Sequence, residues 1–447
     1  RFFGDSKPMG MRLPVVAIVG RPNVGKSTLF NRIVGKRLSI VHEQEGVTRD
    51  RMAVETDWAG HQFFLVDTGG YIPVSDDIMD REVRKQATIA IDEADVIMLM
   101  VDTKVGVTWE DEEIVKRAKR SKKPIVLLAN KTDNSALESQ SYEFLKLGVG
   151  PAFAISALNG RSIGDALDQV VSTFGEIQIE DEIAEDVIRF AIVGMPNAGK
   201  SSLTNALLGH DRQIVTDIPG TTRDSINTTF KYFDQQYEMI DTAGLRRKAK
   251  VTDSVEFYSS VRTQQAIKSS QVVIVIIDAE KGFVSHDARV MEEVLAAGKG
   301  LIIAVNKWDL ITKTTNTLRD FKQNMIDDMF ELRHYPIQFI STLERQRIFK
   351  VVDLVKQIHG EQQKRIPTRQ LNLFLEDVVA RLQPPSPHGK EIKLNYCSQV
   401  ASAPPVIVIF TNHPDLIQTA YKRYIENRFR EMFGFEGVPI RISFRKK

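Results

Sequence analysis

The chain alternates short runs of apolar residues with polar, glycine-containing segments and with stretches that have the apolar spacing of a helix. Continuous apolar runs of this length are typical of strands that are buried on both faces of a parallel sheet. The runs form two series, at residues 15–19, 63–67, 96–101, 125–129 and 152–155, and at residues 190–193, 237–241, 272–277, 301–305 and 337–340. The pattern therefore predicts an α/β fold with two tandem domains, each a mostly parallel sheet with helices on both faces.

A glycine-rich octapeptide follows the first strand of each series, GRPNVGKS at residues 20–27 and GMPNAGKS at residues 194–201, and helical spacing follows at 27–34 and 201–208. Glycines here let backbone N–H groups point at an anion at the positive end of the helix. A glycine-containing turn can match this pattern by chance, but two copies behind two strands favour phosphate sites. The predicted nucleotide contacts are Gly20, Asn23, Gly25, Lys26, Ser27 and Thr28, and Gly194, Asn197, Gly199, Lys200, Ser201 and Ser202. The lysines are expected to reach the β- and γ-phosphates, and Ser27 and Ser201 to offer a hydroxyl to Mg²⁺.

The two halves also share their downstream spacing. Each loop lysine precedes a threonine by 22 residues, and each threonine precedes an aspartate by 19 residues: Lys26, Thr48 and Asp67, and Lys200, Thr222 and Asp241. Such a threonine can close on Mg²⁺ and the γ-phosphate and release them after hydrolysis, although it can also be an ordinary loop residue. The aspartate can hold Mg²⁺ through water, and the glycine three residues later, Gly70 or Gly244, can sense the γ-phosphate. The spacing predicts two switch segments with catalytic roles.

Base recognition is predicted beyond the fourth strand of each series. Asn130, Lys131 and Asp133 follow one such strand, and Asn306, Lys307 and Asp309 follow the other. Each aspartate can accept hydrogen bonds from N1–H and the exocyclic amine of guanine, whereas adenine offers an acceptor there and would leave a carboxylate unpaired. The segments Ser156-Ala157 and Ser341-Thr342 follow the last strands and can place backbone amides near the guanine oxygen.

Taken in order, these motifs resemble those of the translation-factor-related GTPases, and their double occurrence resembles the EngA/Der family of bacterial ribosome-assembly GTPases. The resemblance covers nearly the whole chain from Met11 onward. Thr342 departs from the family pattern, which favours alanine, but the expected contact uses the backbone. The resemblance implies GTP hydrolysis with Mg²⁺, and it implies the ribosomal large-subunit precursor and rRNA as partners, with no DNA and no membrane.

The glutamine that orients water in Ras-like enzymes is replaced by Tyr71 and Leu245, so unassisted hydrolysis is expected to be slow. Asn23 and Asn197 match an asparagine that helps hold K⁺ in similar GTPases, which gives the hypothesis that K⁺ supplies positive charge beside the phosphates. The alternative is that each asparagine only stabilises its loop turn. A basic segment at residues 246–250 is either a solvated face or a switch-linked contact for RNA or the last domain.

Composition fits this picture. The chain of 447 residues has 42% apolar and 26% charged residues and one cysteine, which is expected of a globular, multidomain protein in a reducing compartment. No apolar run reaches membrane-spanning length and no signal-peptide core is found, so we expect a cytoplasmic protein, monomeric by expectation. The predicted domains are 11–175 and 188–364, joined by an acidic linker at 176–187, and 365–447.

The last domain is basic and has its own pattern. Residues 364–447 carry 14 Lys/Arg and 7 Asp/Glu, although the whole chain has a net charge of only +2. Helices are predicted at 371–382 and 414–432, and strands at 392–397, 406–410 and 439–444. This αββαβ order resembles a small α+β, KH-like RNA-binding module. The GxxG clamp of such modules is not found, because Gly434-Phe-Glu-Gly437 has the spacing but is expected to be a turn.

RNA contact would then depend on basic side chains and phosphates. The candidates are Lys390, Lys393, Lys422, Arg423, Arg428, Arg430, Arg445, Lys446 and Lys447. Tyr421 and Tyr424 are either stacking groups or partly buried helix residues, and the second is favoured. The function predicted is a GTP-dependent timer of ribosome assembly. Two alternatives are a GTPase that powers tRNA modification, which would have one GTPase domain and a cysteine-terminated tail, and a guanine-nucleotide sensor with incidental hydrolysis.

Overall fold

A computed structural model describes residues 13–35, 53–68, 87–176, 187–209, 214–215, 227–240, 253–385 and 390–446. The described residues fall into two compact units. One unit takes residues up to 176 together with 253–262, and the other takes 187–240 together with 263–446. No helix among these residues is long and apolar enough to cross a membrane. The domain limits expected from the sequence stay predictions, and most of the acidic segment 176–187 lies outside the described residues.

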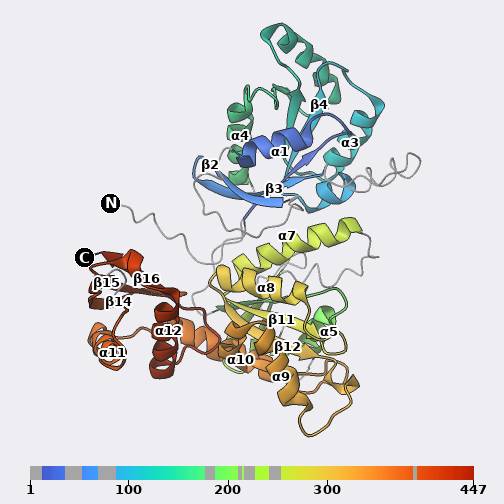
Figure 1. Ribbon diagram of the computed structural model, residues 1–447. Helices are drawn as coiled ribbons and strands as arrows, with labels where there is room; N and C mark the ends of the chain where they lie inside the picture. Colours follow the sequence, from blue (N-terminus) through green and yellow to red (C-terminus); the bar gives the residue numbers. More distant parts are fainter. Residues whose placement is uncertain are drawn as a thin grey trace. The chain divides into compact units, whose positions relative to one another are not determined.

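The first unit contains a six-stranded sheet (Figure 1). Its strands, in spatial order, are β2 (Ala53–Trp58), β3 (His61–Asp67), β1 (Val15–Val19), β4 (Val96–Asp102), β5 (Ile125–Asn130) and β6 (Phe153–Ala154). All neighbours are parallel except β2 and β3. Its helices include α1 (Lys26–Gly35), α3 (Trp109–Arg120) and α4 (Ile163–Ser172), with 3-10 segments η1 (Ser135–Leu147) and η2 (Thr173–Glu176), and residues 87–93 are also helical. Because β3 and β4 flank β1, the chain departs in opposite directions there, and such switch points are where open α/β sheets bind ligands.

The second unit repeats this arrangement in a seven-stranded sheet. Its strands, in spatial order, are β13 (Ile337–Phe339), β12 (Gly300–Asn306), β11 (Val272–Asp278), β7 (Val187–Val193), β10 (Gln235–Ile240), β9 (Thr228–Tyr232) and β8 (Ile214–Val215). The helices are α5 (Lys200–Leu208), α8 (Ser285–Ala296), α9 (Thr317–Asp328) and α10 (Ile348–Gln363), with 3-10 segments η3 (Trp308–Leu310) and η4 (Phe330–His334). The helix α7 (Asp253–Ser269) is divided between the units at residue 262.

Alternation along the central strands builds two cores per sheet. In β1, Val16 and Ile18 pack with residues of α1 and α4 on one face, while Val15, Ala17 and Val19 pack with residues of α3 and η1 on the other. All five residues are at most 3% exposed. Strand β1 is therefore apolar throughout, as the sequence pattern predicted, and polar residues such as Asp67 and Asn130 stand at the carboxyl ends of their strands.

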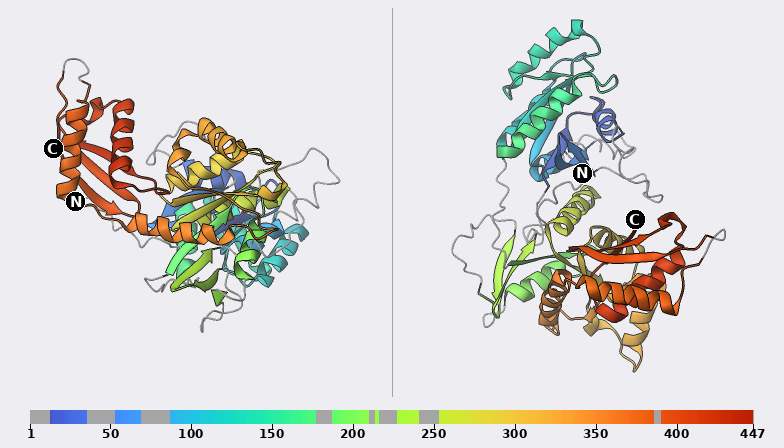
Figure 2. Two further views of the ribbon diagram at one scale, coloured as in Figure 1. Left: turned by 90° about the horizontal axis from the view of Figure 1, so that it is seen from below. Right: turned by 90° about the vertical axis from the view of Figure 1, so that its left-hand side faces the viewer.

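The C-terminal part of the second unit is a three-stranded sheet with two helices on one face (Figures 1 and 2). Its elements are α11 (Thr368–Arg381), β14 (Leu394–Ser402), β15 (Pro405–Thr411), η6 (Pro414–Leu416), α12 (Thr419–Phe433) and β16 (Arg441–Lys446). Strands β14 and β15 are antiparallel, and β15 and β16 are parallel. The αββαβ order is the one predicted, which confirms an α/β protein with a small α+β domain. The predicted helix at 414–432 is a 3-10 turn followed by α12.

The apolar core of this small domain is continuous with that of the seven-stranded sheet. Residues of α10 pack against both, and the turn before β16 adds backbone hydrogen bonds. Leu301 N donates to Gly437 O at 2.9 Å, and Gly437 N donates to His334 O at 2.8 Å. A Cβ at Gly437 would lie 2.5 Å from Ile358 Cδ1, so only glycine fits. The segment at 434–437 is thus a packed turn, as expected.

Candidate nucleotide-binding sites

Two sites, which we call the first site (residues 20–28, 67, 130–133 and 156–157) and the second site (residues 194–202, 306–309 and 341–342), lie at the carboxyl ends of the two sheets. Each loop begins where the central strand ends. The φ angle is +100° at Gly25 and +106° at Gly199, a region that side chains rarely adopt. A Cβ would also lie 2.4 Å from Asn130 Nδ2 at the first position and 2.1 Å from Asn306 Nδ2 at the second. Both positions therefore require glycine.

The loop lysines fold back onto their own loops. Lys26 Nζ donates to Gly20 O at 2.9 Å and to Arg21 O at 2.8 Å, and Lys200 Nζ donates to the carbonyls of residues 194 and 195 at 2.7 and 2.8 Å. Burial lowers the pKa of each lysine to about 8. A desolvated ammonium whose hydrogen bonds go to neutral carbonyls gains much from an anion, so both lysines are suited to bind a phosphate.

A buried asparagine ties each phosphate loop to the base-binding segment. Asn130 Nδ2 donates to Val24 O at 2.7 Å, and Asn130 Oδ1 accepts from Ala157 N at 2.8 Å. The second site repeats this, with Asn306 bonded to Ala198 O at 2.9 Å and to Thr342 N at 3.1 Å. The two asparagines are 3% and 1% exposed. These bonds hold the two loops of each site together, and direct contact of the asparagines with a nucleotide stays a prediction.

Carboxylates from neighbouring strands hold the lysines of the base motifs. Lys131 Nζ lies 2.6 Å from Asp102 Oδ2, and Lys307 Nζ lies 2.6 Å from Asp278 Oδ2. Both lysines have left-handed backbones, with φ of 66° and 60°. The hydrogen bond that Lys307 donates to Asp278 raises the pKa of Lys307. Each lysine stem is therefore fixed beside the place where a base would stack.

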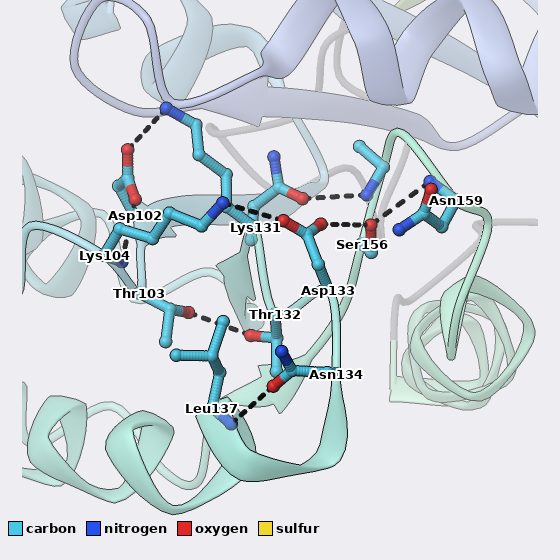
Figure 3. Close-up of polar contacts among 12 residues, drawn as sticks. Asp102, Thr103, Lys104, Lys131, Thr132, Asp133, Asn134, Leu137, Ser156 and Asn159 are labelled. Carbon is cyan, nitrogen blue, oxygen red and sulfur yellow. Dashed lines mark hydrogen bonds and ion pairs between the residues drawn. The ribbon is translucent and has the colours of Figure 1, made fainter.

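In the first site the carboxylate of Asp133, the predicted base reader, has two partners (Figure 3). Lys104 Nζ lies 2.8 Å from Asp133 Oδ2, and Ser156 Oγ donates to Asp133 Oδ1 at 2.8 Å. The lysine and then the serine lower the pKa of Asp133. Ser156 Oγ is itself fixed by a hydrogen bond from Asn159 N at 3.1 Å. Asp133 is therefore held ionised in an ordered geometry.

In the second site the corresponding carboxylate, that of Asp309, has fewer hydrogen-bond donors among the described residues. Among the described residues, none donates a hydrogen bond to Asp309 Oδ1, which is buried. Ser341 Oγ still accepts from Glu344 N at 3.1 Å, as its counterpart does in the first site. A buried carboxylate oxygen without a donor is costly, and a base with N–H groups offers the missing bonds.

The magnesium donors predicted from the sequence are placed in part. Ser27 and Ser201 lie exposed in the first turns of α1 and α5, as do Thr28 and Ser202. Asp67 ends β3 and is 5% exposed, and its charge acts on Lys26 by raising the lysine's pKa against the effect of burial. A hydroxyl and a carboxylate beside the phosphate-binding lysine are hard oxygen donors, which fit Mg²⁺.

Asn23 and Asn197 are exposed at the tips of the loops, with φ of 63° and 64°. Asparagine tolerates this left-handed conformation better than most residues, which supports the turn-stabilising interpretation. Several other predicted residues lie outside the described ones: Thr48, Gly70, Tyr71, Thr222, Asp241, Gly244, Leu245 and the basic segment 246–250.

The predicted RNA contacts of the last domain are partly wrong. Arg430 is 9% exposed and donates to Phe435 O at 3.0 Å and to Val438 O at 3.1 Å, so it holds the turn before β16. Arg428 is half-buried and lies 3.3 Å from Asp377. The exposed candidates are Lys390, Lys393, Lys422, Arg423, Arg445 and Lys446, whereas Lys447 lies outside the described residues.

The two tyrosines of α12 are anchored within the protein. Tyr421 is 3% exposed and its hydroxyl donates to Leu382 O at 2.7 Å, while the Tyr424 hydroxyl donates to Val378 O at 3.3 Å. Their hydroxyls therefore serve the packing of α12 on α11, which agrees with the favoured prediction that both tyrosines are partly buried helix residues.

Sequence reasoning missed two basic residues at the first site. Lys104 reaches Asp133 from the turn after β4, and Arg32 of α1 donates to the carbonyls of Ala157 and Leu158. The corresponding residues of the second half are Glu280 and Ala206. Aligning the two halves would have shown these differences, but only the topology brings each side chain to its partner.

Comparisons with known proteins agree on one family. A family model described as "50S ribosome-binding GTPase" matches residues 15–131 and 189–307, and one described as "KH-domain-like of EngA bacterial GTPase enzymes, C-terminal" matches residues 365–445. The chain is 47% identical to "GTPase Der" of Geobacillus sp. (strain WCH70) over 98% of the chain and 100% of that protein. It is 46% identical to "GTPase Der" of Gemmatimonas aurantiaca over the same shares. A structure of Era with MgGDPNP and a 16S ribosomal RNA fragment is 23% identical, with a TM-score of 0.30, over 59% of this chain and 94% of that one.

Proposed function

Since the chain belongs to the GTPase Der family and is a GTP hydrolase with two GTPase domains, we propose that it acts as a nucleotide-dependent switch in assembly of the large ribosomal subunit. The proposal rests on one observation. The strand β12 begins beside Gly437 of the KH-like domain and ends at Asn306 of the second site, so one strand links the base-binding motif to the basic domain. A change at the nucleotide is thereby transmitted to the RNA-binding candidate.

The reaction is attack of water on the γ-phosphorus of GTP, with GDP and phosphate as products. The two loop lysines leave their carbonyl partners for the β- and γ-phosphates, and the loop amides bind the same oxygens. Asp133 and Asp309 select guanine. Thr48 and Thr222, with Gly70 and Gly244, are proposed to close on the γ-phosphate and to reopen after hydrolysis.

Mg²⁺ would be held by Ser27 and Asp67 in the first site and by Ser201 and Asp241 in the second, with Thr48 and Thr222 joining in the GTP state. Bound there, it would neutralise charge on the phosphates. Neither site has the Ras-type glutamine, so positive charge from K⁺ near Asn23 and Asn197 is proposed to assist. Turnover that is equal in potassium and sodium buffers would contradict the role of K⁺.

The partner is proposed to be the large-subunit precursor, contacted through rRNA. The exposed lysines and arginines of the KH-like domain favour contacts with phosphates over base readout, since the tyrosines of α12 are engaged internally. Binding should therefore weaken steeply with salt. We keep the guanine-nucleotide sensor as the alternative; turnover stimulated by ribosomal particles would exclude it.

The test is co-sedimentation of the chain with ribosomal particles in GDP, GTP and a non-hydrolysable GTP analogue. The wild type is compared with Lys26→Ala and Lys200→Ala, each of which disables one site. Pelleting should depend on the nucleotide in the wild type and lose that dependence in a variant. Pelleting that is the same with every nucleotide and in every variant would overturn the switch.

A further inference from the structure

The two turns that follow the central strands β4 and β11 have the same backbone and opposite charge. Lys104 N donates to Asp102 Oδ1 at 3.0 Å, and Glu280 N donates to Asp278 Oδ1 at 3.1 Å. Asp102 pairs in register with Asn130. The same register joins Asp278 and Asn306, so Lys104 and Glu280 occupy equivalent positions. Any difference between them therefore arises from the side chains.

Their side chains have different partners. The ammonium of Lys104 lies 2.8 Å from the base-reading Asp133 and is half-exposed, as Figure 3 shows. The carboxylate of Glu280 instead lies 3.8 Å from Lys307, and no described residue donates to Asp309 Oδ1. Asp133 therefore has an ammonium on one oxygen, Oδ2, and a hydroxyl on the other, whereas Asp309 Oδ1 has no donor among the described residues.

We propose that Lys104 is a built-in competitor for guanine at the first site, so that it lowers the affinity of that site and helps to set the order in which the two sites fill. This inference rests on the proposed base-reading role of Asp133. Guanine gains less from a carboxylate that already has an ammonium and a hydroxyl as partners, because binding must weaken or displace one of them. At the second site the base meets a carboxylate without such a rival.

If Lys104 is a competitor, its removal should change nucleotide affinity in the direction opposite to that expected from long-range electrostatics. Removal of a lysine near a polyphosphate normally weakens binding, because a favourable long-range charge is lost. Removal of a competitor strengthens it. An exposed ion pair corresponds to about a twofold to fivefold change in affinity, which is the expected effect of Lys104→Ala at the first site.

The experiment uses the full chain and measures nucleotide binding at one site while the other site is occupied by a different nucleotide. In an Asp309→Asn background, the second site is filled with xanthosine diphosphate, whose 2-oxo group matches the asparagine amide, and fluorescent GDP and GTP are titrated into the first site. Lys104→Ala should tighten both nucleotides about twofold to fivefold, with the gain shrinking at high salt. The control is Lys116→Ala, which removes an exposed lysine paired at 2.7 Å with Glu113; it should change neither affinity.

The converse variant is Glu280→Lys in an Asp133→Asn background, and it should weaken GDP at the second site by a similar factor. Unchanged or weaker GDP binding in Lys104→Ala overturns the competitor while leaving guanine recognition intact. If the wild type binds no GDP at the first site, or if Asp309→Asn brings no xanthine binding, the base-reading role itself fails.

Discussion

The two nucleotide sites of this chain share a backbone and differ in the side chains around the base. Both have a left-handed glycine against the asparagine of the base motif, and in both a lysine bonds to two loop carbonyls. The first site adds Lys104 on Asp133 and Arg32 on the base loop. The second has Glu280 and Ala206 at those positions. The two halves therefore share the glycine, asparagine and lysine contacts of the phosphate loop, and they differ in the side chains around the base motif.

This difference indicates which positions the two halves can vary without loss of nucleotide binding or hydrolysis. Asn130 and Asn306 connect the phosphate loop to the base loop through buried bonds, so a change there would disturb both functions. Lys104 is half-exposed, and its ammonium contacts the predicted base-reading carboxylate of Asp133. If Lys104 competes with guanine as proposed, substitution at that turn would change the affinity of the first site alone, and the two sites would respond to two levels of guanine nucleotide.

The largest expected effect comes from the carboxylates that both sites share. Asp133→Asn should change the ratio of GDP to xanthosine diphosphate affinity at the first site by about 10⁴-fold, because the amide reverses one hydrogen bond and leaves guanine a misplaced donor. Asp309→Asn should do the same at the second site. Titrations with both nucleotides measure the ratio, and a variant that keeps its preference for GDP would show that the aspartate does not read the base.

The second largest effect, the loss of hydrolysis when a loop lysine is removed, should be equal in the two halves. Lys26→Ala and Lys200→Ala each remove the charge that stabilises the transferred phosphoryl group, and each should slow hydrolysis at its own site by about 10²–10³-fold. Single-turnover hydrolysis, with the other site blocked by its lysine variant, gives the two rates. If one variant leaves hydrolysis intact, the half that carries it does not hydrolyse GTP, and the two sites differ in catalysis.

A smaller effect is the response to pH. Burial lowers the pKa of each loop lysine to about 8, and phosphate binding should raise it, so the free protein should lose the proton first as pH rises. GDP affinity should depend little on these lysines below pH 7 and fall about tenfold between pH 7 and pH 9 at both sites. Titrations across this range test it, with Lys26→Met expected to be insensitive at the first site; a flat profile in the wild type would contradict the lowered pKa.

The smallest effect, a change in GDP affinity, should occur at the first site alone. Arg32→Ala removes two hydrogen bonds from α1 to the base loop of the first site, and it should weaken GDP there by about twofold to fivefold while the second site is unchanged. Site-specific titration, as for Lys104, measures both. An equal loss at both sites would show that the variant acts through the general stability of the chain.

The sequence predicted the phosphate loops, the parallel strands and the αββαβ domain because each depends on neighbouring residues and on local periodicity. It missed β2, whose residues AVETDW alternate without a clear apolar run, and the contact of Lys104 with Asp133, which joins turns 29 residues apart. Arg430 looked like a surface charge, since its partners are carbonyls that only the folded turn brings near. Side-chain partners across strands depend on topology, which a linear pattern does not contain.

The most direct test of the central claim is calorimetric titration of the full chain with GDP and, separately, with ADP. Two GDP molecules should bind per chain, and Asp133→Asn and Asp309→Asn should each remove one of them, while ADP should not bind at either site. A single GDP per chain, or uptake of ADP with an affinity like that of GDP, would contradict two sites that select guanine through one carboxylate each.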